Sequence, residues 1–188
     1  MNFIEQLKKF DVELFLYING KHNAFFDFMM YWFSDRLIWI PFYLLLLILI
    51  AKNFTKKETL LMLVFVAVLI TFSDQLSAHL LKNFFHRLRP CHNEQLKKLI
   101  HLVSDCGGQY GFVSSHATNS FALAIYLSFT ARKKIAWLKF MLIPWAILVS
   151  YSRIYCGVHY PADIFCGALL GISLGYLFEE IYFYVEFA

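Results

Sequence analysis

Three ionisable side chains lie close together in the segment 151–163, between two apolar stretches: Arg153, His159 and Asp163. His159 and Asp163 are four residues apart, so a helix that begins near Pro161 would place both on one face of its first turn. A carboxylate beside an imidazole fixes its tautomer and stabilises its cation, which makes the histidine a better nucleophile or base. Arg153 could offer a phosphate a permanent, forked positive charge. The alternative is an interfacial loop whose polar residues merely face lipid headgroups.

Two further polar segments carry groups of the same kind. One contains Lys82 and Arg89, and the other contains Ser114, Ser115 and His116 at the start of an apolar stretch. With the arginine of the first segment they offer three cations without matching acids, which indicates an anionic ligand of more than one charge, most simply a phosphate. The N–H groups at a helix N-terminus also favour an anion. Too few carboxylates accompany the histidines for a divalent-metal site, so we expect chemistry without a metal or another cofactor.

The composition indicates an integral membrane protein of one domain. Of the 188 residues 60% are hydrophobic, 19% are aromatic and only 16% are charged, whereas a soluble domain is about half apolar and about a quarter charged. The net charge is +4, and no basic run is long enough to indicate binding to nucleic acid. Residues 1–20 contain three acids and no clean apolar core, so no cleavable signal peptide is expected.

The apolar stretches predict an all-α, polytopic bundle of transmembrane helices. The five clear spans are Leu37–Ala51, Thr59–Leu81, Ala117–Ala131, Ala136–Ser150 and Ile164–Tyr184. The last span contains Gly167, Gly171 and Gly175 at intervals of four residues. Such a stripe of small residues permits a neighbouring helix to approach closely.

The N-terminal part, residues 1–36, carries no motif. Residues 3–18 show helical periodicity with charges on the side away from the apolar residues, which favours a helix that lies in the membrane interface. Asn19 and Gly20 end it. Residues 24–34 are too short to span, so they either form a second in-plane helix or join the first segment in an imperfect sixth span. The bundle itself would be residues 37–184 of a single domain, with active-site loops at 82–116 and 151–163.

The order of the spans places the loops 83–113 and 151–163 on the same side of the membrane. The opposite side receives two groups of basic residues, Lys52, Lys56 and Lys57, and Arg132, Lys133, Lys134 and Lys139. By the positive-inside rule that side is cytoplasmic, so the polar loops face the periplasm or the cell exterior. Cys91 and Cys106 lie in the longer loop; a disulfide between them, favoured only in an oxidising compartment, and two free thiols both remain open.

In chain order, the first motif is residues 82–90, the second is 113–116 and the third is 152–163. The spacing of the first and third motifs resembles that of the type 2 phosphatidic acid phosphatase superfamily. Its members are membrane lipid phosphatases that share their site with vanadium haloperoxidases. That family has a lysine, six residues and Arg-Pro, which Lys82 and Arg89-Pro90 match. It also has Ser-Arg, five residues, His, three residues and Asp, which Ser152-Arg153, His159 and Asp163 match without a gap. The family's Pro-Ser-Gly-His is matched more loosely by Val113-Ser114-Ser115-His116. The resemblance covers residues 82–163.

The resemblance implies roles for these residues. His159 would attack phosphorus to form a phosphohistidine, Asp163 would orient His159, and His116 would protonate the leaving oxygen and then activate water. The phosphoryl oxygens would be held by Lys82, Arg89, Ser114, Ser115 and Arg153. Of the remaining polar residues, His86 and Arg87 are expected to touch headgroups or to be solvated, and Asp74 to be a buried partner that holds helices together.

The leading hypothesis is therefore a metal-independent lipid phosphatase in a bacterial inner membrane, with its site facing outward. Candidate substrates are undecaprenyl pyrophosphate, phosphatidylglycerol phosphate, phosphatidic acid and lipid A. No partner other than the lipid and the bilayer is indicated. One alternative is a phosphotransferase with the same intermediate; another is a lipid-binding or transport protein, although binding alone would not need both histidines.

Overall fold

The computed structural model describes residues 2–187, and within that range the chain is helical, with one isolated β-bridge between Leu88 and Tyr110. The α-helices are α1 (Phe3–Asn19), α2 (Ala24–Ser34), α3 (Ile40–Asn53), α4 (Lys56–Asp74), α5 (Lys82–Phe85), α6 (Ser115–Thr130), α7 (Lys139–Tyr155) and α8 (Pro161–Phe187). Short 3₁₀ turns lie at Leu37–Trp39 (η1), Pro90–His92 (η3) and Ala136–Leu138 (η4), and a π-helical segment at Gln75–Leu81 (η2).

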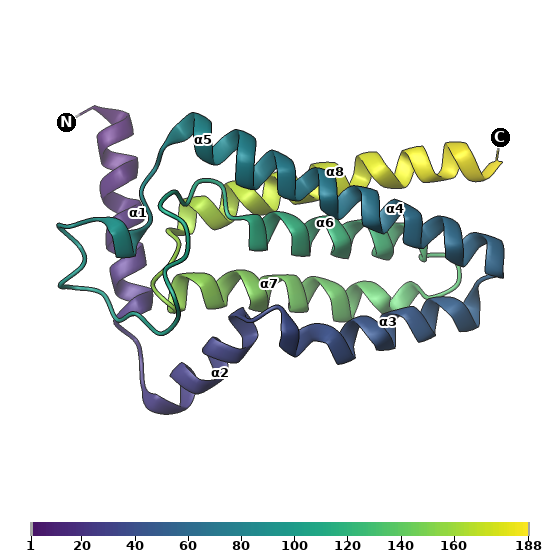
Figure 1. Cartoon of the computed structure of the whole chain (residues 1–188), viewed down its shortest axis with the longest axis horizontal. Helices are drawn as coiled ribbons and strands as arrows, with labels where there is room; N and C mark the ends of the chain where they lie inside the picture. The colour runs from purple at the N-terminus through teal and green to yellow at the C-terminus, as the bar shows by residue number, and fades with distance from the viewer. Residues whose placement is uncertain (1, 188) are drawn as a thin grey trace.

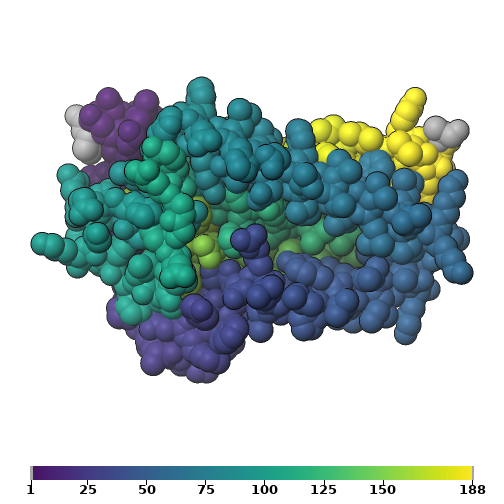
Figure 2. Space-filling model, viewed as in Figure 1, coloured from purple at the N-terminus to yellow at the C-terminus, as the bar shows by residue number. Residues whose placement is uncertain are grey.

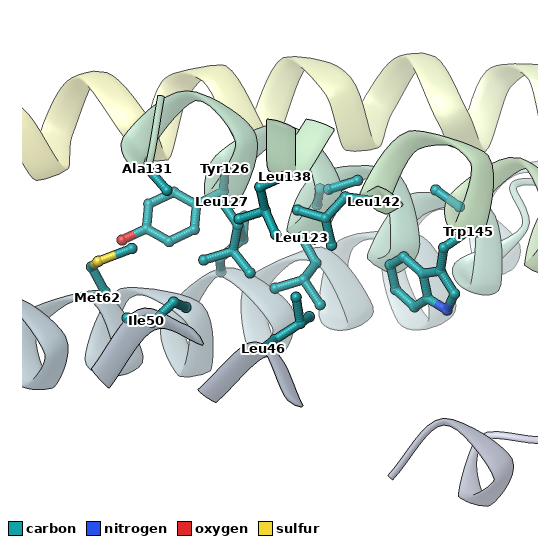
Figure 3. Packing of buried hydrophobic residues seen from close by; sticks show 14 of the residues in the cluster. Leu46, Ile50, Met62, Leu123, Tyr126, Leu127, Ala131, Leu138, Leu142 and Trp145 are labelled. Atoms are coloured by element: carbon teal, nitrogen blue, oxygen red, sulfur yellow. The ribbon is translucent and has the colours of Figure 1, made fainter. Parts of the chain in front are cut away.

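The helices α3, α4, α6, α7 and α8 run side by side, while α1 lies across one end of this bundle (Figure 1). The core between them is made of apolar side chains that interlock along the bundle axis (Figure 3). Its labelled members are Leu46, Ile50, Met62, Leu123, Tyr126, Leu127, Ala131, Leu138, Leu142 and Trp145. Lipid tails are as apolar as these side chains, so in a membrane the association rests on close packing more than on exclusion of water.

The expected close approach of the glycine stripe is confirmed, and the partner is α6. A Cβ atom added at Gly167 would lie 2.7 Å from the carbonyl oxygen of Ser114, and one at Gly175 would lie 2.8 Å from that of Ala122. The stripe therefore brings the α8 backbone against the α6 backbone. Because α6 begins at Ser115 and α8 begins at Pro161, this packing also joins the second and third motifs.

The structure confirms that the protein is all-helical and has apolar helices that could cross a membrane. It does not confirm the number of five spans. Within residues 2–187 two helices are long and apolar enough to cross a membrane: the continuous helix Lys56–Phe85, which comprises α4, η2 and α5, and the helix α8. The pair Ala24–Ser34 and Leu37–Asn53 adds a third apolar unit, although it is bent by 75°. Helices α6 and α7 form near the predicted places but have only 16 and 17 residues.

The N-terminal segment forms two separate helices, and α1 ends at Asn19 as predicted, with Gly20 as its C-cap. The prediction that the charges of α1 lie on the side away from its apolar residues is wrong for one residue. Asp11 is buried against the bundle together with Phe15 and Asn19, whereas the apolar Leu7 and Phe10 are exposed. Exposed apolar side chains suit a helix in the membrane interface, but the acid has a partner inside the protein.

The loops are shorter than predicted. Helix α7 continues to Tyr155, so the second loop comprises only residues 156–160, and the first begins after Phe85. Both loops lie at the end of the bundle that α1 crosses (Figure 1). The open question about the cysteines is answered by a disulfide between Cys91 and Cys106, whose Cα atoms are 6.1 Å apart. It closes a loop across a sequence separation of 15 residues.

Candidate active site

His159 and Asp163 meet, although not by the predicted route. His159 precedes α8, so the two residues do not share a helical turn. Instead, one oxygen of Asp163, Oδ2, accepts the backbone N–H of Tyr160 at 3.1 Å and lies 3.3 Å from Nδ1 of His159. Both side chains are buried, with exposed fractions of 1% for His159 and 0% for Asp163. Because Nδ1 is directed at the carboxylate, Nε2 is the nitrogen left for chemistry.

Gly111 packs against this pair. A Cβ atom at Gly111 would lie 2.9 Å from Oδ2 of Asp163 and 3.5 Å from Nδ1 of His159. Only a residue without a side chain leaves room for the two groups to meet in this position. The sequence alone assigned no role to Gly111. The only feature that could have indicated one is its place three positions before Ser114.

The start of α6 places the second motif beside the first pair. Ser114 is the N-cap of α6, and its backbone N–H donates to the carbonyl oxygen of Asp163 at 3.0 Å. His116 follows in the first turn, where the charges that act on it include those of Arg153, Arg89 and His159. The structure thus brings both predicted histidines to one site.

Lys82 and Ser115 are brought together from the first and second motifs. Nζ of Lys82 donates to the hydroxyl of Ser115 at 3.0 Å. Lys82 directly follows the π-helical segment, and π-type turns inside helices are frequent at functional sites. Of the two adjacent serines, Ser115 therefore contacts a site cation, whereas the hydroxyl of Ser114 accepts the N–H of Ala117 at 3.5 Å as the helix cap.

The two predicted arginines are buried beside the histidines. Nε of Arg89 donates to the carbonyl oxygen of Tyr110 at 3.3 Å, next to the isolated β-bridge between Leu88 and Tyr110. Arg153 donates through Nη1 to the backbone carbonyl of Ser34 at 3.4 Å and to the hydroxyl of the same residue. Within residues 2–187 no acid pairs with either guanidinium. Both retain donors for an anion.

Burial and these cations together favour the neutral form of His159. Burial lowers the pKa of His159 well below its ordinary 6.5, and the positive charges of Arg89, Arg153, Lys82 and Arg87 lower it further. His159 is therefore neutral at physiological pH. A neutral imidazole has a free lone pair, as a nucleophile requires.

The contacts of Arg87 contradict the prediction that this residue touches headgroups or is solvated. Its Nη1 donates to Oδ1 of Asp163 at 2.8 Å, and its Nη2 donates to Oδ2 of Asp11 at 2.5 Å. The two carboxylates raise the pKa of Arg87 against the effect of burial. The sequence offered no signal for this pairing, because Asp11 lies in a segment that matches no motif.

Asp74 has the helix-bridging role that was expected of it. Its Oδ1 accepts the side-chain N–H of Asn119 at 3.2 Å, and Asn119 accepts in turn from the hydroxyl of Ser73 at 2.5 Å. These bonds join the end of α4 to α6. They fix the helix that carries Lys82 next to the helix that carries His116.

Outside this site, His22, Asp27 and His101 place their ligand atoms within 4.8 Å of one another. The two imidazole rings are stacked, with centroids 3.7 Å apart and planes at 7°. Each imidazole nitrogen offers its lone pair in its own ring plane, so one ion could not lie in both planes at once. His101 instead contacts Asp27 through Nε2 at 2.9 Å, which ties the long loop to α2.

The site end of the molecule is hollowed. Figure 2 shows a depression bordered by the teal long loop and by the blue and indigo atoms of α2 to α4, with yellow-green atoms of the α7–α8 region on its floor. A separate groove of about 620 Å³ lies between α1, the end of α5 and the start of α8. Its walls are mostly apolar, including Leu7, Phe85 and Phe112, and Arg87 and Asp11 lie at its side.

Residues 59–186 match the PAP2 superfamily, a stretch that contains all three motifs. The chain belongs to the PAP2 superfamily. It is 41% identical over 180 residues to the lipid A 4'-phosphatase of Bacteroides thetaiotaomicron, covering 95% of this chain and 79% of that protein. It is also 32% identical to an undecaprenyl-diphosphatase of Sulfolobus acidocaldarius, covering 94% of this chain and 81% of that protein.

The crystal structure of LpxE from Aquifex aeolicus has a similar arrangement of helices. It superposes with a TM-score of 0.66 at 27% identity and covers 90% of this chain and 94% of its own. The family that the motifs resembled is therefore confirmed, and so is the prediction of a lipid phosphate phosphatase.

Proposed function

We propose that this phosphatase removes a phosphate group from a lipid A-type glycolipid, through a phosphohistidine at His159, on the outer side of the membrane. The observation that carries the proposal is the buried pair His159 and Asp163, with Nδ1 and Oδ2 3.3 Å apart. The charges of Arg89 and Arg153 act on this pair, and neither arginine pairs with an acid in the described chain. Such a site can bind a phosphate dianion and present a neutral nucleophile to it.

The positions of the side chains support the following reaction. Nε2 of His159 attacks phosphorus while the bond to the leaving oxygen breaks, and His116 donates a proton to that oxygen. His116 then takes a proton from a water molecule that attacks the phosphohistidine, and inorganic phosphate leaves. Asp163 stabilises the positive charge that His159 gains. The phosphoryl oxygens are held by Lys82, Arg89, Arg153 and Ser115, while Ser114 caps the helix that positions His116.

The helix arrangement supports a polytopic placement with the site outward. We propose that α3, α4, α6, α7 and α8 each cross the bilayer of a bacterial inner membrane, because they lie side by side (Figure 1). The basic clusters at Lys52–Lys57 and Arg132–Lys134 lie at the end away from the site, as a cytoplasmic face requires. The disulfide between Cys91 and Cys106 favours an oxidising compartment for the site end.

The choice of lipid A rests on the relatives and on the groove. The Bacteroides relative named a lipid A 4'-phosphatase covers nearly the whole chain at 41% identity, against 32% for the undecaprenyl-diphosphatase. The apolar groove beside Arg87 offers space for acyl chains next to the site. A helix α1 with exposed apolar residues would let such chains enter from the membrane interface.

The test is a phosphate-release panel with purified protein in detergent and chelator. Bisphosphorylated lipid A, undecaprenyl pyrophosphate, phosphatidylglycerol phosphate and phosphatidic acid are compared, with mass spectrometry to locate the phosphate that lipid A loses. We expect release from lipid A in preference to the others, and none from the His159→Ala or His116→Ala variants. Faster release from undecaprenyl pyrophosphate would overturn the choice of lipid, and near-normal turnover by either variant would overturn the mechanism. Transfer of phosphate to another lipid, without free phosphate, would indicate a transferase.

A further inference from the structure

Asp11 of α1 is the unexpected acid of this structure. It is 7% exposed, although the helix around it presents Leu7 and Phe10 to the outside. A buried carboxylate is costly unless its oxygens are bonded. Both are: Oδ1 accepts the backbone N–H of Ala162 at 2.8 Å, and Oδ2 accepts Nη2 of Arg87 at 2.5 Å.

Arg87 connects Asp11 to the reacting pair. Its second arm, Nη1, donates to Oδ1 of Asp163 at 2.8 Å, so one guanidinium bridges two carboxylates. The other oxygen of Asp163 faces Nδ1 of His159 at 3.3 Å. The ring of Tyr160 lies 4.2 Å from the centre of the guanidinium and packs against it. The chain of contacts thus runs from α1 to the nucleophile without a gap.

The bridge constrains position. A guanidinium held by one carboxylate can turn about that contact, whereas two carboxylates fix both arms of its planar fork. Asp11 also binds the N–H of Ala162, the residue next to Asp163, so the acid holds the first turn of α8 as well as the arginine that contacts it. The carboxylate that orients His159 is therefore clamped from both its backbone and its side chain.

The bridge also sets charge. Arg87 alone would neutralise Asp163 and weaken its effect on a positively charged imidazole. Because Asp11 shares the guanidinium, the two acids and one arginine keep a net charge of −1, from −2 + 1. Asp163 can then stabilise the cation that His159 becomes when it binds phosphorus.

We propose that Asp11 is a positioning residue for the phosphatase reaction: through Arg87 and the N–H of Ala162 it holds Asp163 in place and keeps its negative charge available to His159. The N-terminal helix, which precedes the stretch that matches the superfamily, is then part of the active site. This inference rests on the proposed role of His159.

The experiment uses Asp11→Asn in the full-length protein. An asparagine side chain can still accept the N–H of Ala162 through its oxygen, but its NH₂ group cannot accept from Arg87. The substitution therefore removes the ion pair and spares the cap of α8. The matched control is Glu13→Gln, two positions away on the same helix, where an exposed side chain lies 3.7 Å from Lys9.

We expect kcat to fall at least about tenfold in Asp11→Asn with KM within about twofold of the wild type, because the phosphate-binding cations are untouched. Glu13→Gln keeps both constants. Arg87→Lys, which keeps one positive charge but cannot reach both carboxylates, should show the same fall in kcat. In an Arg87→Gln background, Asp11→Asn should add less than about a twofold further loss.

Fluorescence-detected size-exclusion profiles and melting temperatures normalise each rate to folded protein. If Asp11→Asn does not fold, the kcat of Arg87→Lys tests the inference in its place. Turnover by Asp11→Asn or Arg87→Lys equal to that of the wild type, or a change in KM alone, would overturn the inference while the proposed function stands. A wild-type protein that releases no phosphate from any lipid, with His159→Ala identical to it, would overturn both.

Discussion

His159 precedes the first residue of α8 and Asp163 follows it, and Nδ1 of His159 lies 3.3 Å from Oδ2 of Asp163. The carboxylate reaches back because Oδ2 also caps the N–H of Tyr160 at 3.1 Å. One acid therefore begins the helix and fixes the tautomer of the histidine. Because the oxygen that caps the start of α8 also contacts Nδ1, the position of the helix start determines how the ring of His159 is oriented.

Asp163→Asn tests the charge of this acid. An amide oxygen in the place of Oδ2 can still accept from Tyr160 and from Nδ1 of His159, but an uncharged side chain cannot stabilise the imidazolium, and its NH₂ group would face Nη1 of Arg87. We expect kcat per folded molecule to fall by about 10³ to 10⁴. Phosphate release and thermal unfolding are measured on the same preparations, so that each rate refers to folded protein. A loss of activity in proportion to a loss of folded protein would contradict an electrostatic role.

Gly111→Ala tests the contact of Gly111 with the pair His159 and Asp163, which the sequence did not predict. The added Cβ would lie 2.9 Å from Oδ2 of Asp163 and 3.2 Å from Cγ of Arg89, so the site must shift. A displacement of about 1 Å at reacting groups can cost about a hundredfold in rate, and we expect a fall in kcat of about ten- to a hundredfold. Gly108→Ala is the matched control, because a Cβ there has no heavy atom within 4 Å. Equal activity of the two variants would contradict the packing of Gly111 against the pair.

The low pKa of His159 predicts a dependence of stability on pH. The unfolded chain binds a proton at this residue below about pH 6.5, whereas the folded protein, in which the pKa of His159 is lower, binds it only at a lower pH. The unfolded state then carries more protons, so stability from this group is present above pH 6.5 and is lost as the pH falls. One such group changes the free energy of unfolding by at most about 1.4 kcal/mol per pH unit.

His159→Gln removes that titration and is the comparison. Thermal unfolding of the wild type and the variant in detergent should be measured from about pH 8 to about pH 5. We expect the wild type to lose stability more steeply than the variant below pH 6.5. Parallel curves would show that His159 takes up its proton in the folded protein.

The motifs predicted much of the site because their spacing is fixed by local chemistry. Lys82, His116 and His159 come to one end of the bundle, and each lies at or next to a helix terminus, as an alternation of apolar and polar stretches indicates. The glycine stripe likewise identified a closely packed helix face. These features depend on residues near one another in the chain or on composition, which a single sequence displays.

The missed features depend on contacts between distant segments. Asp11 looked like one more charge on an amphipathic helix, and Arg87 like a loop cation, because nothing local pairs residues that lie 76 positions apart. Helix ends were also misplaced: α7 continues to Tyr155, past the polar residues that suggested a loop, because Arg153 finds a partner in Ser34 of α2. Partners of that kind are visible only after the helices have packed.

The disulfide predicts a difference between oxidised and reduced protein. Cys91 and Cys106 close a loop over a separation of 15 residues, for which the chain-entropy estimate is a stabilisation of about 3 kcal/mol. We expect Cys91→Ser with Cys106→Ser to lower the melting temperature, and a membrane-permeant reductant to lower that of the wild type alone. Free-thiol labelling after unfolding should detect the buried Cys156 and the half-buried Cys166 in oxidised protein. Labelling of all four cysteines without reductant would contradict the bridge.

The packing of α8 on α6 links global stability to the site. A Cβ at Gly167 would lie 2.7 Å from the carbonyl oxygen of Ser114 and 3.2 Å from Cβ of Ala117. Since a backbone atom cannot turn aside, Gly167→Val must push the two helices apart, at a cost of about 1 to 3 kcal/mol. Ser114 donates its N–H to the carbonyl of Asp163 at 3.0 Å, so the same movement separates His116 from His159.

Gly167→Val should therefore lower both the melting temperature and the kcat of the protein that remains folded. Ser173→Val is the matched control, since Ser173 is exposed on α8 and bonds only within its own helix, to the carbonyl of Leu169 at 2.9 Å. We expect that variant to keep its activity and to unfold near the wild-type temperature. If Gly167→Val lost stability but kept the wild-type kcat per folded molecule, the spacing between α6 and α8 would not be what holds the two histidines at one phosphorus.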